Sequence, residues 1–142
     1  MFTLGSGDGA TAQRVARLVA EGWMPQAAVT AAERLWSARL ANGVQMPNGE
    51  TARIEPDDLY HLIVDERIWR KPERIERVLA GVIAIHEAAS GRRRAFSRWD
   101  EDGTTLLGYA ILEPNSRVRT MHLLDAKRFE RRRRKARLLW TL

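Results

Sequence analysis

The chain has 142 residues, of which 44% are hydrophobic and 30% are charged, a composition that fits one compact domain or a domain with a small helical appendage. It contains no cysteine, which excludes disulfides and thiolate metal sites. Residues 1–20 lack a basic start followed by an apolar segment, and no apolar run reaches transmembrane length. We therefore expect no signal peptide, no membrane partner and a cytoplasmic location.

The charge is polarised along the chain. Residues 1–90 carry 10 Lys or Arg and 12 Asp or Glu, a net charge of −2, whereas residues 91–142 carry 14 and 6, a net charge of +8. Such asymmetry attracts anions and speeds their encounter with the basic half. Arg outnumbers Lys by 21 to 3, and the Arg guanidinium suits bidentate phosphate contacts. This pattern predicts a polyanionic partner, with nucleic acid as the leading candidate.

The N-terminal part predicts a helical hairpin. Ser6 or Asp8 is positioned to cap a first helix that ends at Gly22, and a second helix begins at Pro25. The segment after it is rich in Gly, Asn and Pro, which is typical of a loop. We divide the chain into two parts: 1–55, a helical hairpin and loop, and 56–142, an α+β nucleic-acid-binding domain.

Two further helices are predicted before the hydrophobic period changes. Pro56 with two following acids opens one helix, which runs to about Val64. Pro72 opens the next, and Gly81 ends it. The charged segment between them, residues 65–71, is predicted to be a connector.

The C-terminal half predicts a sheet followed by a helix. Four strands separated by strong turn signals are expected at 82–88, 92–99, 104–112 and 117–124. Short connections make them sequential antiparallel neighbours. The fold class is therefore α+β, with N-terminal helices, a four-stranded antiparallel meander and a basic C-terminal helix that starts near Asp125 and runs to the end.

Two groups of basic residues are candidates for phosphate binding. On the C-terminal helix they are Lys127, Arg128, Arg131, Arg132, Arg133, Arg134 and Lys135. On the strands they are Arg92, Arg93, Arg98 and Arg119. The alternative for the helix is a solvated run anchored by Phe129 and the last apolar residues. Phe96 and Trp99, interleaved with the strand arginines, either stack on bases or belong to the core.

A catalytic row follows from an assumed strand register. Two-residue loops at Ser90-Gly91 and Pro114-Asn115, with a four-residue loop at 100–103, align Glu87, Arg94, Tyr109 and Thr120 in one cross-strand row, and the next row on that face contains His122. These groups are suited to RNA cleavage by the 2′-hydroxyl: Glu or His takes the proton, Arg stabilises the phosphorus centre, and His or Tyr assists the leaving oxygen. The alternative is that helices cover this apolar face and Glu87–Arg94 is an ion pair.

The order of these parts resembles a known family. His61 on a helix is followed by a second helix, an Ile/Val-rich strand, an Arg-rich strand, an apolar strand, and a strand with a hydroxyl and a His. Over about residues 57–124 this resembles the compact ribonuclease fold of barnase, RelE, the tRNA-cleaving colicins and related phage-associated nucleases. The resemblance implies a toxin, toxin-system or phage-derived protein. By analogy it carries over the positions His61, Glu87, Arg94, Thr120 and His122.

Three functional interpretations remain open from the sequence. The first is a metal-independent endoribonuclease, which favours RNA over DNA as the partner. The second is a non-catalytic nucleic-acid-binding protein, and the third is an interaction module for an acidic protein partner or inhibitor. The three histidines lack the close spacing of a metal site, so we predict no metal and no other cofactor. The sequence does not indicate the oligomeric state.

Overall fold

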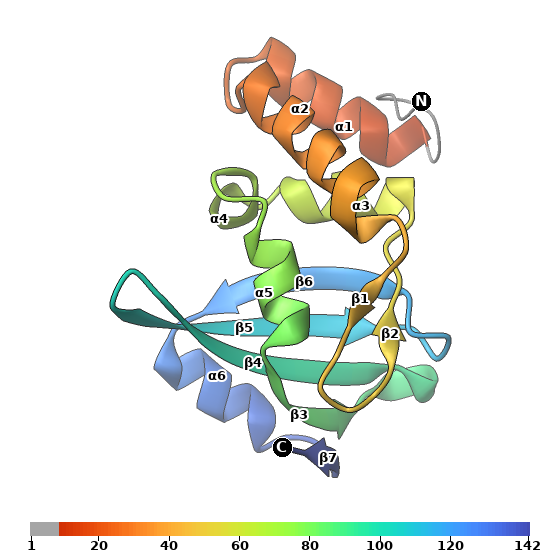
Figure 1. The fold of residues 1–142 in the computed structure, drawn as a ribbon, viewed down its shortest axis with the longest axis vertical. Helices are drawn as coiled ribbons and strands as arrows, with labels where there is room; N and C mark the ends of the chain where they lie inside the picture. Colours follow the sequence, from red (N-terminus) through yellow and green to blue (C-terminus); the bar gives the residue numbers. More distant parts are fainter. Residues whose placement is uncertain (1–8) are drawn as a thin grey trace.

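The computed structural model describes residues 9–142 and has an α+β fold. Helices pack on one face of a five-stranded antiparallel sheet, and the last helix packs on the other face (Figure 1). The proposed caps Ser6 and Asp8 lie outside the described residues. Within residues 9–142, no helix is both long enough and apolar enough to cross a membrane.

The predicted N-terminal hairpin is confirmed. It consists of α1 (Gly9–Ala20) and α2 (Gln26–Leu35), and a π-helical turn (Trp36–Leu40) extends the second helix. Gly22 adopts a φ of 81° in the turn between them, a conformation that costs glycine little. The following segment was predicted to be a loop, but it contains a small hairpin, β1 (Val44–Gln45) with β2 (Thr51–Ala52).

Three helices lie between the β1–β2 hairpin and the five-stranded sheet. Two of them, α3 (Pro56–Ile63) and α5 (Arg74–Ala80), were predicted from their prolines and first-turn acids. Between them, the predicted connector contains a short helix, α4 (Glu66–Trp69). This helix forms because the Asp65 carboxylate caps it, accepting the Arg67 backbone N–H at 2.9 Å.

The predicted meander is present, but the sheet has a fifth strand. The meander consists of β3 (Val82–Glu87), β4 (Arg93–Glu101), β5 (Thr104–Leu112) and β6 (Val118–Leu124). The C-terminal helix, α6 (Ala126–Arg133), is shorter than predicted, and β7 (Leu138–Thr141) follows it. The strand order is β6-β5-β4-β3-β7, so β6 and β7 are the two edges.

The chain returns to the sheet because its last residues suit a strand. The segment 138–141 consists of three apolar residues and a threonine, and its Trp140 lies opposite Ile85 of β3 and packs against the main core. The run of arginines before it favours exposure to solvent over a longer helix packed on the sheet. The predicted continuous C-terminal helix is therefore wrong beyond Arg133.

The assumed strand register is also wrong, because the turns differ from those assumed. The β4–β5 turn contains only Asp102 and Gly103, both with positive φ, so the two strands are longer and Arg94 faces Ile111. Across the β5–β6 hairpin Tyr109 faces His122, and Thr120 faces Ile111. Between β3 and β4 the slip is one residue, which places Glu87 on the opposite face from Arg94.

Two hydrophobic clusters lie on the two faces of the sheet. The main core combines Val15 and Val29 of the N-terminal hairpin with α3, α5 and the small residues Ala95 and Ala110 of the sheet. The parts 1–55 and 56–142 thus share this core. The second cluster is smaller and attaches α6 to the other face; its buried members are Phe96, Tyr109, Leu124 and Phe129.

Candidate active site and nucleic-acid interface

His122 on the edge strand β6 links a carboxylate to a hydroxyl. Its Nδ1 lies 3.1 Å from Oδ2 of Asp65, and its Nε2 lies 3.4 Å from Oγ1 of Thr120. Thr120 and His122 are two residues apart on a strand and therefore project to the same side. An ionised carboxylate only accepts hydrogen bonds, so Nδ1–H donates to Asp65. The lone pair of Nε2 then points toward Thr120, in the arrangement of a general base that a carboxylate orients.

Asp65 is held in place by α4 as well as by His122. Its Oδ1 accepts the Arg67 N–H at the start of the helix, and its Oδ2 contacts the imidazole. The hydrogen bond from His122 lowers the pKa of Asp65, against the effect of partial burial, and the Arg67 N–H and charge lower it further. Asp65 therefore stays ionised at neutral pH and favours a proton on Nδ1 of His122.

The pocket beside His122 brings guanidinium groups to this dyad. It is an open pocket of about 600 Å³, lined by three arginines and by three carboxylates: Arg67, Arg128, Arg132, Asp65, Glu66 and Asp125. The Arg132 guanidinium lies over the Tyr109 ring at 4.8 Å, and Tyr109 is the cross-strand neighbour of His122. Arg132 forms no ion pair with any residue of the described chain. A phosphate in this pocket would meet a base and an uncompensated cation together.

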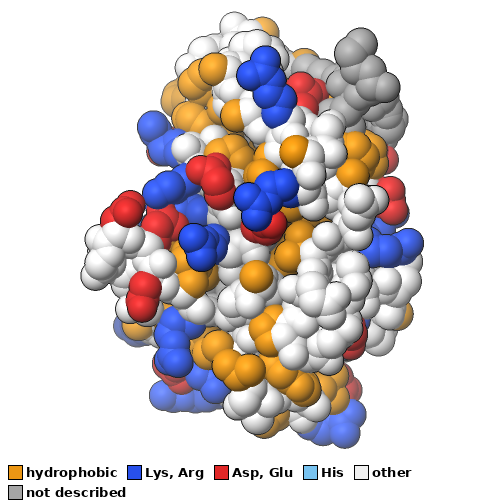
Figure 2. All heavy atoms as spheres, in the orientation of Figure 1, with side chains coloured by type: hydrophobic (Ala, Val, Ile, Leu, Met, Phe, Trp, Pro, Cys, Tyr) orange, Lys and Arg blue, Asp and Glu red, His pale blue; other side chains and the backbone are white. Residues whose placement is uncertain are grey.

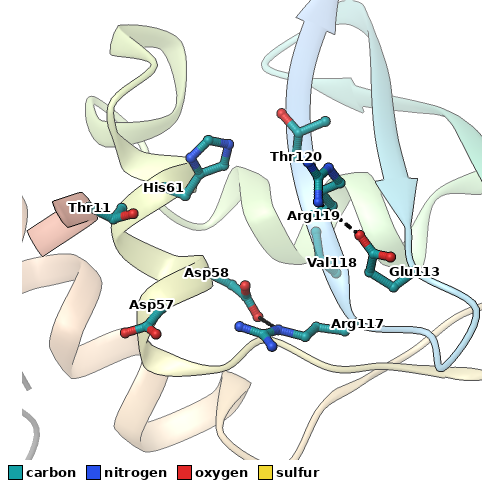
Figure 3. Close-up of a pocket in the computed structure, with 9 residues that line it drawn as sticks. All are labelled: Thr11, Asp57, Asp58, His61, Glu113, Arg117, Val118, Arg119 and Thr120. Atoms are coloured by element: carbon teal, nitrogen blue, oxygen red, sulfur yellow. Dashed lines mark hydrogen bonds and ion pairs between the residues drawn. The ribbon is translucent and has the colours of Figure 1, made fainter. Parts of the chain in front are cut away.

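A second pocket lies on the other side of Thr120. It measures about 360 Å³, and Figure 3 shows His61 on α3 facing it across from Thr120 on β6. The two arginines that line it are paired: Arg117 with Asp58 at 2.8 Å and Arg119 with Glu113 at 3.1 Å. Thr120 thus lines the pocket of His61 on α3 and contacts His122 on β6, so it lies between the two imidazoles.

The six predicted catalytic residues do not form one site. Arg94, Tyr109, Thr120 and His122 share the face that α6 partly covers. Tyr109 is only 2% exposed, so its ring supports Arg132 and its hydroxyl does not face solvent. Nε of Arg94 is buried without a hydrogen-bond partner in the described chain. Glu87 lies on the opposite face, where Arg137 binds it at 2.7 Å, and is not brought to His122.

The predicted phosphate-binding residues of the sheet are mostly paired with carboxylates. Arg92 and Arg119 both bind Glu113, at 3.1 Å in each case, and Arg93 binds Glu50 at 2.6 Å. Desolvation is the largest single influence on the pKa of Glu113 and would raise it, but hydrogen bonds from Arg119 and Arg92, together with their charges, bring the pKa below its ordinary value. These arginines hold the sheet to its turns and to the β1–β2 hairpin. Arg98 is exposed and has no ion pair within the described chain.

The basic residues of α6 differ, because most lack an acidic partner. Arg128 contacts Asp125 at 3.7 Å, and Arg133 contacts Glu130 at 3.4 Å. The remaining predicted residues on the solvent side of this helix and just after it are exposed and make no ion pair within residues 9–142: Lys127, Arg131, Arg134 and Lys135. These cations form the strongest candidate surface for a phosphate backbone.

Two other expectations concern aromatics and metals. Phe96 and Trp99 are core residues, at 0% and 8% exposure, and Trp99 donates its Nε1–H to Glu101. Base stacking on these two rings is therefore excluded. Residues 9–142 contain no group of three or more His, Cys, Asp or Glu positioned to hold a metal ion.

Asp65 was not predicted to be a partner of His122. Its local signal was present, since an Asp before a short amphipathic segment is typical of a helix cap. The contact itself joins residues 57 positions apart, and nothing in the sequence indicates that they meet.

Comparison of the chain with protein-family models, with curated proteins and with solved structures gives no match in any of the three.

Proposed function

We propose that this protein binds RNA and cleaves it without a metal, by attack of a 2′-hydroxyl on the adjacent phosphorus at His122. The observation that carries the proposal is the fixed orientation of His122 between Asp65 and Thr120, in a pocket that also contains the unpaired Arg132. The requirement for a 2′-hydroxyl favours RNA over DNA as the substrate.

The chemistry assigns one proton transfer to each imidazole. Nε2 of His122 takes the 2′-hydroxyl proton, and Asp65 stabilises the imidazolium that forms. The 2′-oxygen bonds to phosphorus and the bond to the 5′-oxygen breaks. His61, across the adjoining pocket, gives a proton to that leaving oxygen. The products are a 2′,3′-cyclic phosphate and a 5′-hydroxyl, and Arg132 stabilises the charge on phosphorus.

The basic surface of α6 supports the binding half of the proposal. Lys127, Arg131, Arg134 and Lys135 are exposed cations on and just after the helix whose inner side supplies Arg132. A strand of RNA along this surface enters the His122 pocket by way of Arg128. Binding of this kind neutralises phosphates and depends steeply on salt.

The resemblance to the barnase, RelE and colicin ribonucleases belongs to the same proposal. It suggests a toxin-type or phage-associated role. Within that group we assign the chemistry here to His61, Thr120 and His122, with Arg132 in place of Arg94 and with Asp65 in place of Glu87.

The test is incubation of the purified protein with labelled RNA and with DNA in EDTA. The key variants are His122→Asn, which keeps a polar group beside Asp65, and Asp65→Asn, whose side chain still caps α4. We expect RNA cleavage by the wild-type protein and its loss in both variants, with folding intact by circular dichroism. Cleavage by both variants at the wild-type rate would rule out this site.

The second candidate function is binding without cleavage, and the unpaired cations of α6 favour it independently of His122. In that case RNA and DNA bind with similar salt dependence and neither is cut. Substitution of His122 then leaves the affinity unchanged, whereas removal of basic residues from α6 weakens it in steps.

A further inference from the structure

The exposed large hydrophobic residues of the described chain gather at one place. Of four such residues, three lie among the last five positions: Leu138, Leu139 and Leu142, at 51%, 44% and 79% exposure, and the fourth is Trp23 in the N-terminal hairpin, at 71%. Figure 2 shows hydrophobic side chains at the lower end of the molecule, the end where Figure 1 places β7, with basic side chains on either side. Clustered apolar exposure of this kind marks an interaction surface.

The backbone of β7 is also available on one side. This strand is an edge of the sheet and is paired only with β3. Natural edge strands resist further pairing through a charged residue, a proline, a bulge or short length. Strand β7 is four residues long and its pairing with β3 shifts register once. The segment 138–142 contains no charged residue and no proline, and the nearest charge, Arg137, is bound to Glu87 at 2.7 Å. An added strand would meet unpaired N–H and C=O groups and no cation within the seam.

The surrounding charge indicates the kind of strand that fits. Residues 125–137 carry eight Lys or Arg and two acids. A second copy of this chain, added by antiparallel pairing of β7 with itself, would place two such segments on the same face of a joined sheet and make them repel. Nucleic acid would satisfy the cations and leave the leucines exposed. Charge complementarity therefore favours an acidic polypeptide.

We propose that β7 accepts an extended segment of an acidic protein, which extends the sheet by one strand. Apolar side chains on one face of that segment cover Leu139, and carboxylates on its other face reach the cations that follow α6, Arg134 and Lys135. Strand addition of this type takes its affinity from main-chain hydrogen bonds and its specificity from alternate side chains. This surface shares Arg134 and Lys135 with the one proposed for RNA, but it does not include His122, so strand addition at β7 does not depend on RNA cleavage.

The experiment uses three synthetic peptides and the isotope-labelled full chain, without RNA. One peptide alternates valine and glutamate over nine residues, the second has lysine in place of glutamate, and the third is the acidic peptide N-methylated at alternate positions. We expect the acidic peptide to bind at least about tenfold more tightly than either of the others, because it alone supplies both the ladder and the charge. Slowed amide exchange should be confined to the β7 backbone.

The variant Leu139→Lys should lose this binding, and Trp23→Lys, which changes an exposed hydrophobic residue far from β7, should keep it. If the N-methylated peptide binds as tightly as the acidic peptide, binding depends on charge and not on main-chain hydrogen bonds, and the proposal is overturned. Light scattering that finds a dimer abolished by Leu139→Lys would also overturn it, since the occupant would then be a second copy. Absence of acidic-peptide binding would do the same.

Discussion

The arginines of the sheet and the arginines of α6 have different partners, although the sequence presents both as basic clusters. Arg92, Arg93 and Arg119 each bind a glutamate, which links the strands to their turns and to the β1–β2 hairpin. On α6, Arg131 and Arg132 have no acidic partner within the described chain. A cation that is already paired stabilises the fold, whereas an unpaired one is available to a phosphate. Composition alone does not separate these two roles.

The largest effect is expected on the rate of RNA cleavage, from substitutions of His122 and Asp65 beside the unpaired Arg132. Loss of the His122 imidazole removes the proposed base, so His122→Asn should slow RNA cleavage about 10²- to 10⁴-fold. Asp65→Asn should act in the same direction, because an amide no longer stabilises the imidazolium. Initial rates on a short RNA in EDTA measure both, and unchanged thermal unfolding excludes a general loss of structure. Equal cleavage rates for the wild type and both variants would show that His122 and Asp65 do not take part in cleavage.

The next effect concerns the attachment of α6 to the sheet. Phe129 is 3% exposed and packs edge-on against Phe96 at 5.5 Å. Phe129→Ala should lower the free energy of unfolding by about 3 to 5 kcal/mol. Denaturant titration measures this loss. The variant should also bind RNA less tightly, because undocking disperses the cations of α6; a variant that is destabilised yet binds normally would contradict this link.

A third prediction compares the two sets of arginines directly. The double variant Arg131→Ala, Arg134→Ala should reduce the slope of log affinity against log salt by roughly 1 to 2, as expected when two phosphate contacts are lost. Arg92→Ala with Arg93→Ala should leave the slope unchanged and lower stability. Arg34→Ala, an exposed cation on α2, is the control for charge alone. A similar slope change in the sheet variant would invalidate the distinction between paired and unpaired arginines.

The smallest effect is a loss of stability at acidic pH, and it concerns Glu101, whose carboxylate is paired with Arg74 and Lys71. Hydrogen bonds from Arg74, and then from Lys71 and Trp99, bring the pKa of Glu101 down to about 2 despite the opposing effect of burial. Because this pKa is depressed in the folded state, the stabilisation is complete above the unfolded value of 4.5 and is lost as the pH falls toward 2. Glu101→Gln should remove that part of the pH dependence, about 1 kcal/mol or less. Unfolding measured across this range should show a flatter profile in the variant.

Much of the fold was predictable because its signals are local. Pro56 marks the start of α3 and Gly81 the end of α5, both in the sequence and in the structure. The hydrophobic pattern predicted four strands of the sheet. The strand β7 was missed because its apolar residues follow four arginines, and together they are compatible with one helix. Cross-strand partners were predicted wrongly because one residue more or fewer in a turn shifts every pair in the hairpin. In the β3–β4 hairpin the residue opposite Arg94 is His86 and not the predicted Glu87.

The candidate site was predictable only in part, for the same reason. Thr120 and His122 share a face of one strand whatever the register, so the sequence could place them together. Asp65 and Arg132 reach His122 from α4 and α6, and only the packing of these helices brings them there. Glu87 was included in the predicted catalytic row because the loop between β3 and β4 was assumed to be one residue shorter than it is, which would have paired Glu87 with Arg94 instead of Arg93.

The most direct test of the central claim is cleavage of an RNA oligonucleotide of defined sequence, compared with the same oligonucleotide carrying a single 2′-deoxy nucleotide at the cleavage position. Both are incubated with the wild-type protein in EDTA, and the ends of the products are identified by mass spectrometry. We expect a 2′,3′-cyclic phosphate and a 5′-hydroxyl from the RNA, and no cut at the deoxy position. Cleavage at the deoxy position, or no cleavage of either oligonucleotide, would contradict the proposed mechanism.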